Sequence, residues 1–175
     1  MSRIFIVYST TDGHTVKICS RLKALLEEEN HEVESVPVES AGGEALEAAD
    51  KVVIGASIRY GKHSKKIHEF VGRYAAVLER RPNAFFSVNV VARKPNRNTP
   101  QTNPYLRRFL TQIAWEPMHL AVFAGKIDYP SYGVFDRSMI RMIMWITKGP
   151  TDPKAQIEFT DWDKVREFGD LISKM

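Results

Sequence analysis

The chain has 175 residues, 43% of them hydrophobic, with three Trp, six Tyr and nine Phe. This length and composition predict one globular domain over residues 1–175 and exclude wholesale disorder. The formal net charge is +4, the single Cys19 excludes an internal disulfide, and no segment approaches the roughly 20 apolar residues of a membrane-spanning helix.

Apolar runs and helical patterns alternate along the chain, as in an α/β protein. The expected strands are Arg3–Tyr8, Glu32–Val38, Lys51–Ala56, Ala84–Val91 and Leu120–Ile127. The expected helices are Thr15–Glu29, Gly43–Ala49, Ser64–Leu78, Pro104–Ile113, Val134–Thr147 and Trp162–Ile172. Five strands with intervening helices predict a doubly wound parallel sheet with helices on both faces.

The turn between the first strand and the first helix is rich in hydroxyl groups and carries a glycine. Its residues are Ser9, Thr10, Thr11, Asp12, Gly13, His14 and Thr15. A strand, such a turn and a helix N-terminus together can hold a phosphate group, because backbone N–H groups converge on the anion. The chain lacks G-x-x-x-x-G-K-[ST] and G-x-G-x-x-G, which disfavours ATP, GTP and Rossmann-type NAD binding. A simple helix start is the alternative interpretation of this turn.

Two further strand ends carry polar and aromatic residues. The first comprises Ser57, Ile58, Arg59, Tyr60 and Gly61, and the second comprises Ser87, Asn89, Val90, Val91 and Ala92. Ligands of doubly wound sheets bind at the carboxyl ends of the strands. The three strand ends therefore predict one cofactor site at a common edge of the sheet.

Charge is distributed unevenly along the chain. The segment from Glu27 to Asp50 holds only acidic charges, and the segment from Arg59 to Arg108 is mostly basic. A basic side favours an anionic ligand or an anionic membrane surface as partner, although solvated faces would give the same pattern. Nucleic acid is not expected, because no helix-turn-helix, zinc-finger or RNA-binding signature accompanies the charge.

The turn from Thr10 to Thr15 resembles the T-x-T-G-x-T phosphate loop of flavodoxins. That resemblance implies a flavodoxin-like sheet of order 2-1-3-4-5 and FMN as cofactor, with the two later strand ends beside its ring. Asp12 departs from the motif, and we expect its carboxylate to turn away or to accept backbone N–H bonds. Tyr60 is a candidate neighbour of the ring, and Asn89 to Ala92 are expected to offer backbone groups to its polar edge.

A narrower resemblance covers essentially the whole chain. The stretches Val52–Gly61, Ser87–Pro95, Thr99–Asn103, Phe135–Ile140 and Phe159–Trp162 are similar to the family of bacterial quinone-dependent protoporphyrinogen IX dehydrogenases. That family reads T-x-D-G-x-T in the phosphate loop, which accounts for Asp12.

The resemblance implies oxidation of protoporphyrinogen IX to protoporphyrin IX in haem biosynthesis, with menaquinone or ubiquinone as acceptor. Six electrons leave the macrocycle, so a two-electron flavin needs about three cycles. The location implied is peripheral, at the cytoplasmic face of the inner (cell) membrane. No catalytic triad, carboxylate pair or metal cluster is evident, so FMN is expected to carry the chemistry.

Residues 129–153 form an expected insert at the last strand, containing the helix Val134–Thr147. A period of 100° per residue places Phe135, Met139, Met142, Ile143 and Ile146 on one side and sets Met144 and Trp145 close to the cations. The helix either packs this apolar side on the sheet or exposes it to lipid or a large apolar ligand.

Guanidinium groups suit the two propionates of the macrocycle. The residues expected to contact substrate or membrane are Arg93, Lys94, Arg97, Arg137, Arg141 and Trp145. The alternative functions are a flavodoxin-type electron carrier, which the basic charge disfavours, an NAD(P)H:quinone reductase and a flavin-free interaction module.

Overall fold

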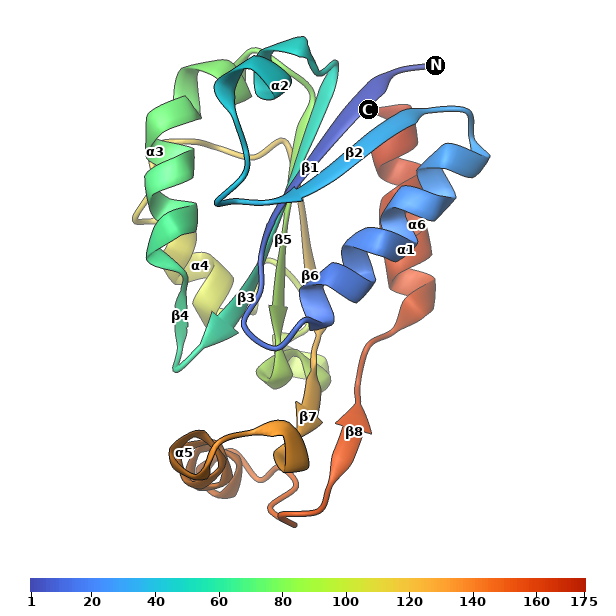
Figure 1. Ribbon diagram of the computed structural model, residues 1–175. Coiled ribbons are helices and arrows are strands. Elements are labelled where there is room, and N and C mark those ends of the chain that lie inside the picture. The colour runs from blue at the N-terminus through green and yellow to red at the C-terminus, as the bar shows by residue number, and fades with distance from the viewer.

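The computed structural model describes residues 1–175 and shows a parallel sheet between two layers of helices (Figure 1). The sheet has the order β2-β1-β3-β5-β6, which confirms the predicted topology. Its strands are β1 (Arg3–Ser9), β2 (Glu32–Pro37), β3 (Lys51–Arg59), β5 (Asn83–Asn89) and β6 (His119–Ala124). A short strand, β4 (Lys62–His63), pairs antiparallel with the end of β3 and was not predicted.

Alternating strand residues form two cores, one on each face of the sheet. In β1, Ile4 and Ile6 join the core under one helix layer, and Phe5 and Val7 join the other. Successive side chains of a strand point to opposite faces, so a wholly apolar strand serves both layers. One layer contains α1 (His14–Glu28) and α6 (Trp162–Lys174); the other contains α2 (Gly43–Ala48), α3 (Lys65–Glu79) and α4 (Pro104–Leu110) (Figure 1).

The predicted strand Ala84–Val91 is too long at its carboxyl end. β5 stops at Asn89, whose Oδ1 accepts the Ala92 N–H at 3.1 Å and starts the 3₁₀ turn η1 (Val90–Arg93). A second turn, η2 (Pro95–Arg97), follows. An asparagine that binds the backbone locally ends a strand in this way, because it replaces the ladder hydrogen bonds.

The predicted strand Leu120–Ile127 is divided at Gly125. β6 ends at Ala124, and β7 (Lys126–Asp128) leaves the main sheet to pair with β8 (Gln156–Glu158), a strand that the sequence did not reveal. Between them lie the turn η3 (Tyr129–Ser131) and the helix α5 (Val134–Ile146). This α5 segment, residues 126–158, lies beyond the carboxyl ends of the sheet strands (Figure 1).

Of the two arrangements left open for α5, packing of the apolar side on the sheet is wrong, and exposure of that side is found in part. Met144, expected beside the cations, is buried against Ile127, Tyr129 and Tyr132. Phe135, which belongs to the apolar side that the sequence predicts, is 72% exposed. The helix packs on its own segment rather than on the sheet, so its contact face is rotated. The exposed large side chains form an apolar stripe of Val134, Phe135, Met142, Trp145 and Ile146.

None of the helices combines the length and the apolar character that crossing a bilayer requires.

Candidate functional site

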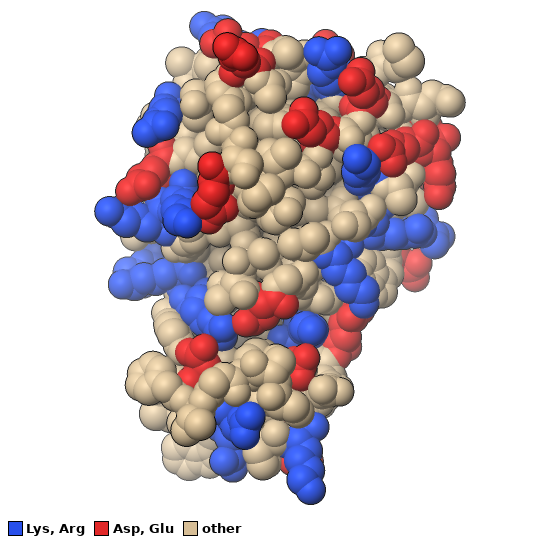
Figure 2. Space-filling model, in the orientation of Figure 1, with Lys and Arg blue, Asp and Glu red and all other residues tan.

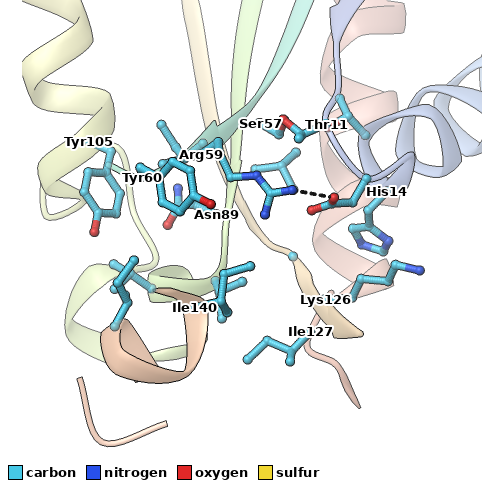
Figure 3. A pocket seen from close by; sticks show the side chains of 18 of the residues that line it. Thr11, His14, Ser57, Arg59, Tyr60, Asn89, Tyr105, Lys126, Ile127 and Ile140 are labelled. Atoms are coloured by element: carbon cyan, nitrogen blue, oxygen red, sulfur yellow. Dashed lines mark hydrogen bonds and ion pairs between the residues drawn. The ribbon is translucent and has the colours of Figure 1, made fainter. Parts of the chain in front are cut away.

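A cavity of about 340 Å³ opens at the carboxyl ends of β1, β3, β5 and β6. This volume is within the range of small-molecule sites, and the position is the one at which doubly wound sheets bind ligands. Side chains from all three predicted strand ends line it, and Figure 3 shows Thr11, Ser57 and Asn89 together in it. The predicted convergence of these segments is therefore present in the structure.

The phosphate-type turn leaves several hydrogen-bonding groups without protein partners. Gly13 has φ of 80°, and its N–H donates to Thr10 Oγ1 at 3.0 Å. No side chain caps the start of α1, so the N–H groups of its first turn remain available to an anion. Thr15 Oγ1 is buried without a hydrogen-bond partner. Buried polar groups are normally satisfied, so this donor set fits a bound phosphate.

His14 adds a second such atom at the same place. Its Nε2 lies 2.6 Å from Thr160 Oγ1, whose hydroxyl donates to the Ala124 carbonyl at 2.7 Å. The Thr160 oxygen must therefore accept, which places the imidazole proton on Nε2 and leaves Nδ1 as an acceptor. His14 Nδ1 is buried and has no partner, and burial lowers the pKa of the ring. A hydroxyl-bearing ligand would satisfy it.

Asp12 is neutralised by an arginine from the neighbouring strand end. Arg59 Nη2 donates to Asp12 Oδ1 at 2.8 Å (dashed in Figure 3) and lies 3.8 Å from Asp136 Oδ2 of α5. Burial raises the pKa of the Asp12 carboxyl, and the Arg59 guanidinium opposes that shift. The carboxylate accepts from this side chain, so of the two expectations for Asp12 the acceptance of backbone N–H bonds is wrong. Its charge is thereby compensated beside the phosphate-type turn.

The turn between β3 and β4 presents an aromatic ring at the mouth of the cavity. Tyr60 has φ of 49° and Gly61 has φ of 77°, the pair of positive values that a two-residue type I′ hairpin requires. Ser57, Ile58 and Arg59 therefore belong to β3, and only Tyr60 and Gly61 form the turn. The Tyr60 hydroxyl donates to Asp136 Oδ1, which connects the turn to α5.

The other residues that line the cavity are mostly apolar and were missed by the sequence analysis. These residues are Val88, Tyr105, Gly125, Lys126, Ile127, Tyr132, Ile140, Ile143 and Met144. Gly125-Lys126 follows a fourth strand end, a signal that the sequence offered. The α5 residues recur at helical spacing, but nothing local showed that this face turned toward the cavity.

Three of the predicted cofactor-binding residues do not line the cavity. Gly13 shapes the phosphate-type turn, and Ala92 is buried in η1. Ser87 is fully buried, with its Oγ 2.9 Å from His63 Nε2 and accepting from Asn89 Nδ2 at 3.3 Å. These residues support the site from behind rather than facing a ligand.

Three of the four arginines predicted to contact substrate or membrane instead donate hydrogen bonds to backbone carbonyls. Arg93 donates to the carbonyls of Val90 and Thr147 at 3.1 and 3.0 Å. Arg137 Nε donates to the Tyr129 carbonyl at 3.1 Å, and Arg141 Nε donates to that of Thr151 at 2.9 Å.

These bonds tie the α5 segment together and attach it to η1. Lys94 is the N-cap of η2 and Arg97 is its last residue, and neither lines the cavity. Trp145 is 75% exposed on the apolar stripe. Their role in binding substrate stays a prediction.

The flavodoxin domain model matches residues 5–154. The chain is 42% identical, over 99% of its length and 96% of the relative, to the protoporphyrinogen IX dehydrogenase [quinone] of Escherichia coli (strain K12). It is also 42% identical to the protein of the same name from Leishmania major, over 95% of this chain and 72% of that protein. The chain belongs to the quinone-dependent protoporphyrinogen IX dehydrogenase family.

Solved flavodoxin structures support the same fold at low identity. A flavodoxin from the domain Archaea matches with a TM-score of 0.56 and 12% identity, covering 98% of this chain and 96% of its own. Flavodoxin 1 from Bacillus cereus matches with a TM-score of 0.56 and 13% identity over 99% and 98%. This chain has a flavodoxin domain, and its cofactor is FMN. The unpaired Thr15 Oγ1 and His14 Nδ1 fit its phosphate and hydroxyl groups.

Proposed function

We propose that this protein oxidises protoporphyrinogen IX to protoporphyrin IX with FMN as cofactor and a membrane quinone, menaquinone or ubiquinone, as final acceptor. The observation that carries the proposal is the cavity itself. Its phosphate-type turn suits FMN, and the wall of α5 adds an apolar surface of the kind a tetrapyrrole requires. Identity of 42% across the family relative supports the same activity.

The chain's own residues bind, orient and exclude water. Thr10 to Thr15 would hold the FMN phosphate, and Ser57 to Gly61 with Asn89 to Val91 would flank the ring. Bound FMN supplies the two-electron acceptor chemistry. Ile140, Ile143 and Met144 close the cavity from the α5 side and would keep water from the reacting carbon.

The stoichiometry of the proposed reaction follows from the substrate. Protoporphyrinogen IX loses six electrons and six protons to become protoporphyrin IX. With a two-electron cofactor, the reaction would need about three cycles, and three quinones would take up the electrons and protons as quinols.

We propose further that residues 129–153, an insert in the single domain, place the protein on an anionic membrane at its cytoplasmic face. The apolar stripe of α5 includes Trp145, and Arg141 and Lys148 lie near it in sequence. An apolar face that carries Trp and is bordered by cations suits the interface of a bilayer. A quinone dissolved in that bilayer would then lie close to the cavity.

An anaerobic assay tests the catalytic proposal. The FMN-loaded protein is mixed with protoporphyrinogen IX and a menaquinone or ubiquinone analogue, and porphyrin fluorescence is followed. Formation of protoporphyrin only when both FMN and quinone are present supports the dehydrogenase. Bound FMN without porphyrin formation contradicts it and favours an electron carrier; rapid flavin bleaching by NADPH would favour an NAD(P)H:quinone reductase.

Vesicle sedimentation tests the membrane proposal. The double variant Phe135→Gln/Trp145→Gln removes two exposed side chains of the apolar stripe and should bind anionic vesicles at least tenfold more weakly. Met118→Gln, which removes an exposed apolar residue far from α5 in sequence, serves as the matched control. Equal sedimentation of all three proteins would contradict the proposal.

A further inference from the structure

A second recess adjoins the cofactor cavity. It has a volume of about 250 Å³ and shares Gly61 and Tyr105 with the larger cavity. β4, the first turn of α3 and the helix α4 form its walls. Figure 3 shows Tyr105 at the side of the large cavity opposite Thr11 and His14. The recess therefore lies at the end remote from the phosphate-type turn.

The recess is lined by cations and by no acidic residue. Its basic side chains are Lys62, Lys65 and Arg108, and its other lining residues are Gly61, His63, His68, Tyr105, Phe109 and Gln112. Lys65 Nζ forms an ion pair with Glu69 Oε1 at 3.3 Å, whereas Lys62 and Arg108 have no ion-pair partner. Figure 2 shows Lys and Arg side chains gathered at the side of the molecule where Figure 1 places β4 and α4.

The floor of the recess is aromatic and carries no charge of its own. The rings of His63 and His68 lie 4.7 and 4.8 Å from the ring of Phe109. Burial lowers the pKa of His63 to about 3, so this imidazole is neutral at neutral pH. The positive potential thus comes from the lysine and arginine side chains at the rim.

We propose that this recess binds the propionate carboxylates of the tetrapyrrole, with the macrocycle in the adjoining cavity. The inference rests on the proposed function and adds to it the residues that recognise the acidic edge of the substrate. Lys62 and Arg108 have unpaired charges beside the cavity, while Arg93, Arg137 and Arg141 are occupied by backbone carbonyls. An amphipathic ligand with one acidic edge matches a cavity with a partly apolar lining that adjoins a basic recess.

Binding of a redox-inert substrate analogue tests the assignment. Two ligands are titrated into the FMN-loaded protein in detergent. Mesoporphyrin IX has two ionised propionates, and its dimethyl ester has no ionisable carboxyl group. The variant Lys62→Gln/Arg108→Gln should bind the diacid about tenfold more weakly, because two exposed ion pairs are lost. It should bind the ester as the wild type does. Arg107→Gln, next to Arg108 but outside the recess, is the matched control.

The outcomes of these binding measurements separate this inference from its alternatives. An unchanged affinity of the double variant for mesoporphyrin IX overturns the assignment, even where the wild type forms protoporphyrin. Weaker binding to phosphatidylglycerol vesicles with unchanged mesoporphyrin binding also overturns it, in favour of a lipid phosphate. If the wild type binds mesoporphyrin IX but forms no protoporphyrin, the proposed function alone is refuted. Loss of mesoporphyrin IX binding in the double variant would then still support propionate binding in the recess.

Discussion

Single atoms define the phosphate end of the cavity. Thr15 is fully buried and its hydroxyl has no partner, an arrangement that costs free energy unless a ligand completes it. His14 Nδ1 is in the same condition, because Thr160 fixes the proton on Nε2. The polar atoms that would bind the cofactor therefore have free hydrogen-bonding capacity in the cofactor-free protein.

Replacing Thr15 with valine keeps the shape of the side chain and removes the hydroxyl. FMN affinity should fall about tenfold, because a hydrogen bond to a charged phosphate is lost. Riboflavin, which has no phosphate, should bind equally to both proteins. Fluorescence titration measures both ligands. If the melting temperature of the FMN-free variant lay well below that of the FMN-free wild type, the Thr15 hydroxyl would have a partner within the protein, which would contradict the argument.

His63 makes stability depend on pH. Burial lowers its pKa from 6.5 to about 3, so between these values the unfolded chain binds a proton that the folded protein does not. Stability therefore falls as pH falls below 6.5, by about 1.4 kcal/mol per unit for this group.

Between pH 6.5 and about pH 5, the free energy of unfolding of His63→Gln should fall by about 1.4 kcal/mol less per pH unit than that of the wild type. Denaturant unfolding at several pH values measures it. His14, whose pKa is also lowered, lies away from His63, remains in both proteins and cancels in the comparison. Equal slopes would show that His63 is protonated in the folded state.

At the scale of elements, the packing of the central strands depends on one glycine. A Cβ at Gly55 of β3 would lie 2.1 Å from Phe86 Cζ, and Phe86 is fully buried in β5. The two strands pair directly, with Gly55 opposite Phe86 in the register. The ring of Phe86 thus occupies the space of the missing side chain.

Gly55→Ala should lower the free energy of unfolding by about 2 kcal/mol, because the ring must move within a close-packed core. Gly72→Ala is the matched control, since a Cβ there meets nothing within 4 Å. It lies in α3, where alanine should raise stability by about 0.5–1 kcal/mol. Urea unfolding measures both variants. Equal stability of Gly55→Ala and the wild type would show that the ring relocates freely.

At the scale of the whole molecule, the α5 segment is held to the sheet layers by few polar contacts. Arg93 spans from Val90 in η1 to Thr147 at the end of α5. Arg59 and Tyr60 bind Asp136 at the other end of the helix. The cavity wall is therefore positioned from both ends of α5.

Arg93→Met should leave the sheet folded but loosen this attachment. Chymotryptic cleavage at the exposed Phe135 and Trp145 should accelerate about tenfold, because hydrogen bonds to a charged group are lost. Arg97→Met, an exposed arginine outside the contact, is the control. Unchanged cleavage together with a raised KM for protoporphyrinogen IX would instead give Arg93 the substrate role first predicted for it.

The sequence alone was sufficient for the sheet and for one end of the cavity. Apolar strands such as Lys51–Ala56 show their burial locally, and the turn from Thr10 to Thr15 carries its motif in consecutive residues. These features depend on neighbours within one element, so they can be read from the chain. The order of the strands was implied by the resemblance to flavodoxins, not by the alternation of strands with helices.

Tertiary structure decided the rest. The division of the last strand at Gly125 depends on β8, about 30 residues later, and this pairing turns Met144 inward and the apolar stripe outward. The recess joins Lys62 with Arg108, which only the packing of β4 against α4 brings together. Periodicity identifies an apolar face but not its partner. The partner is chosen by the three-dimensional fit of distant segments.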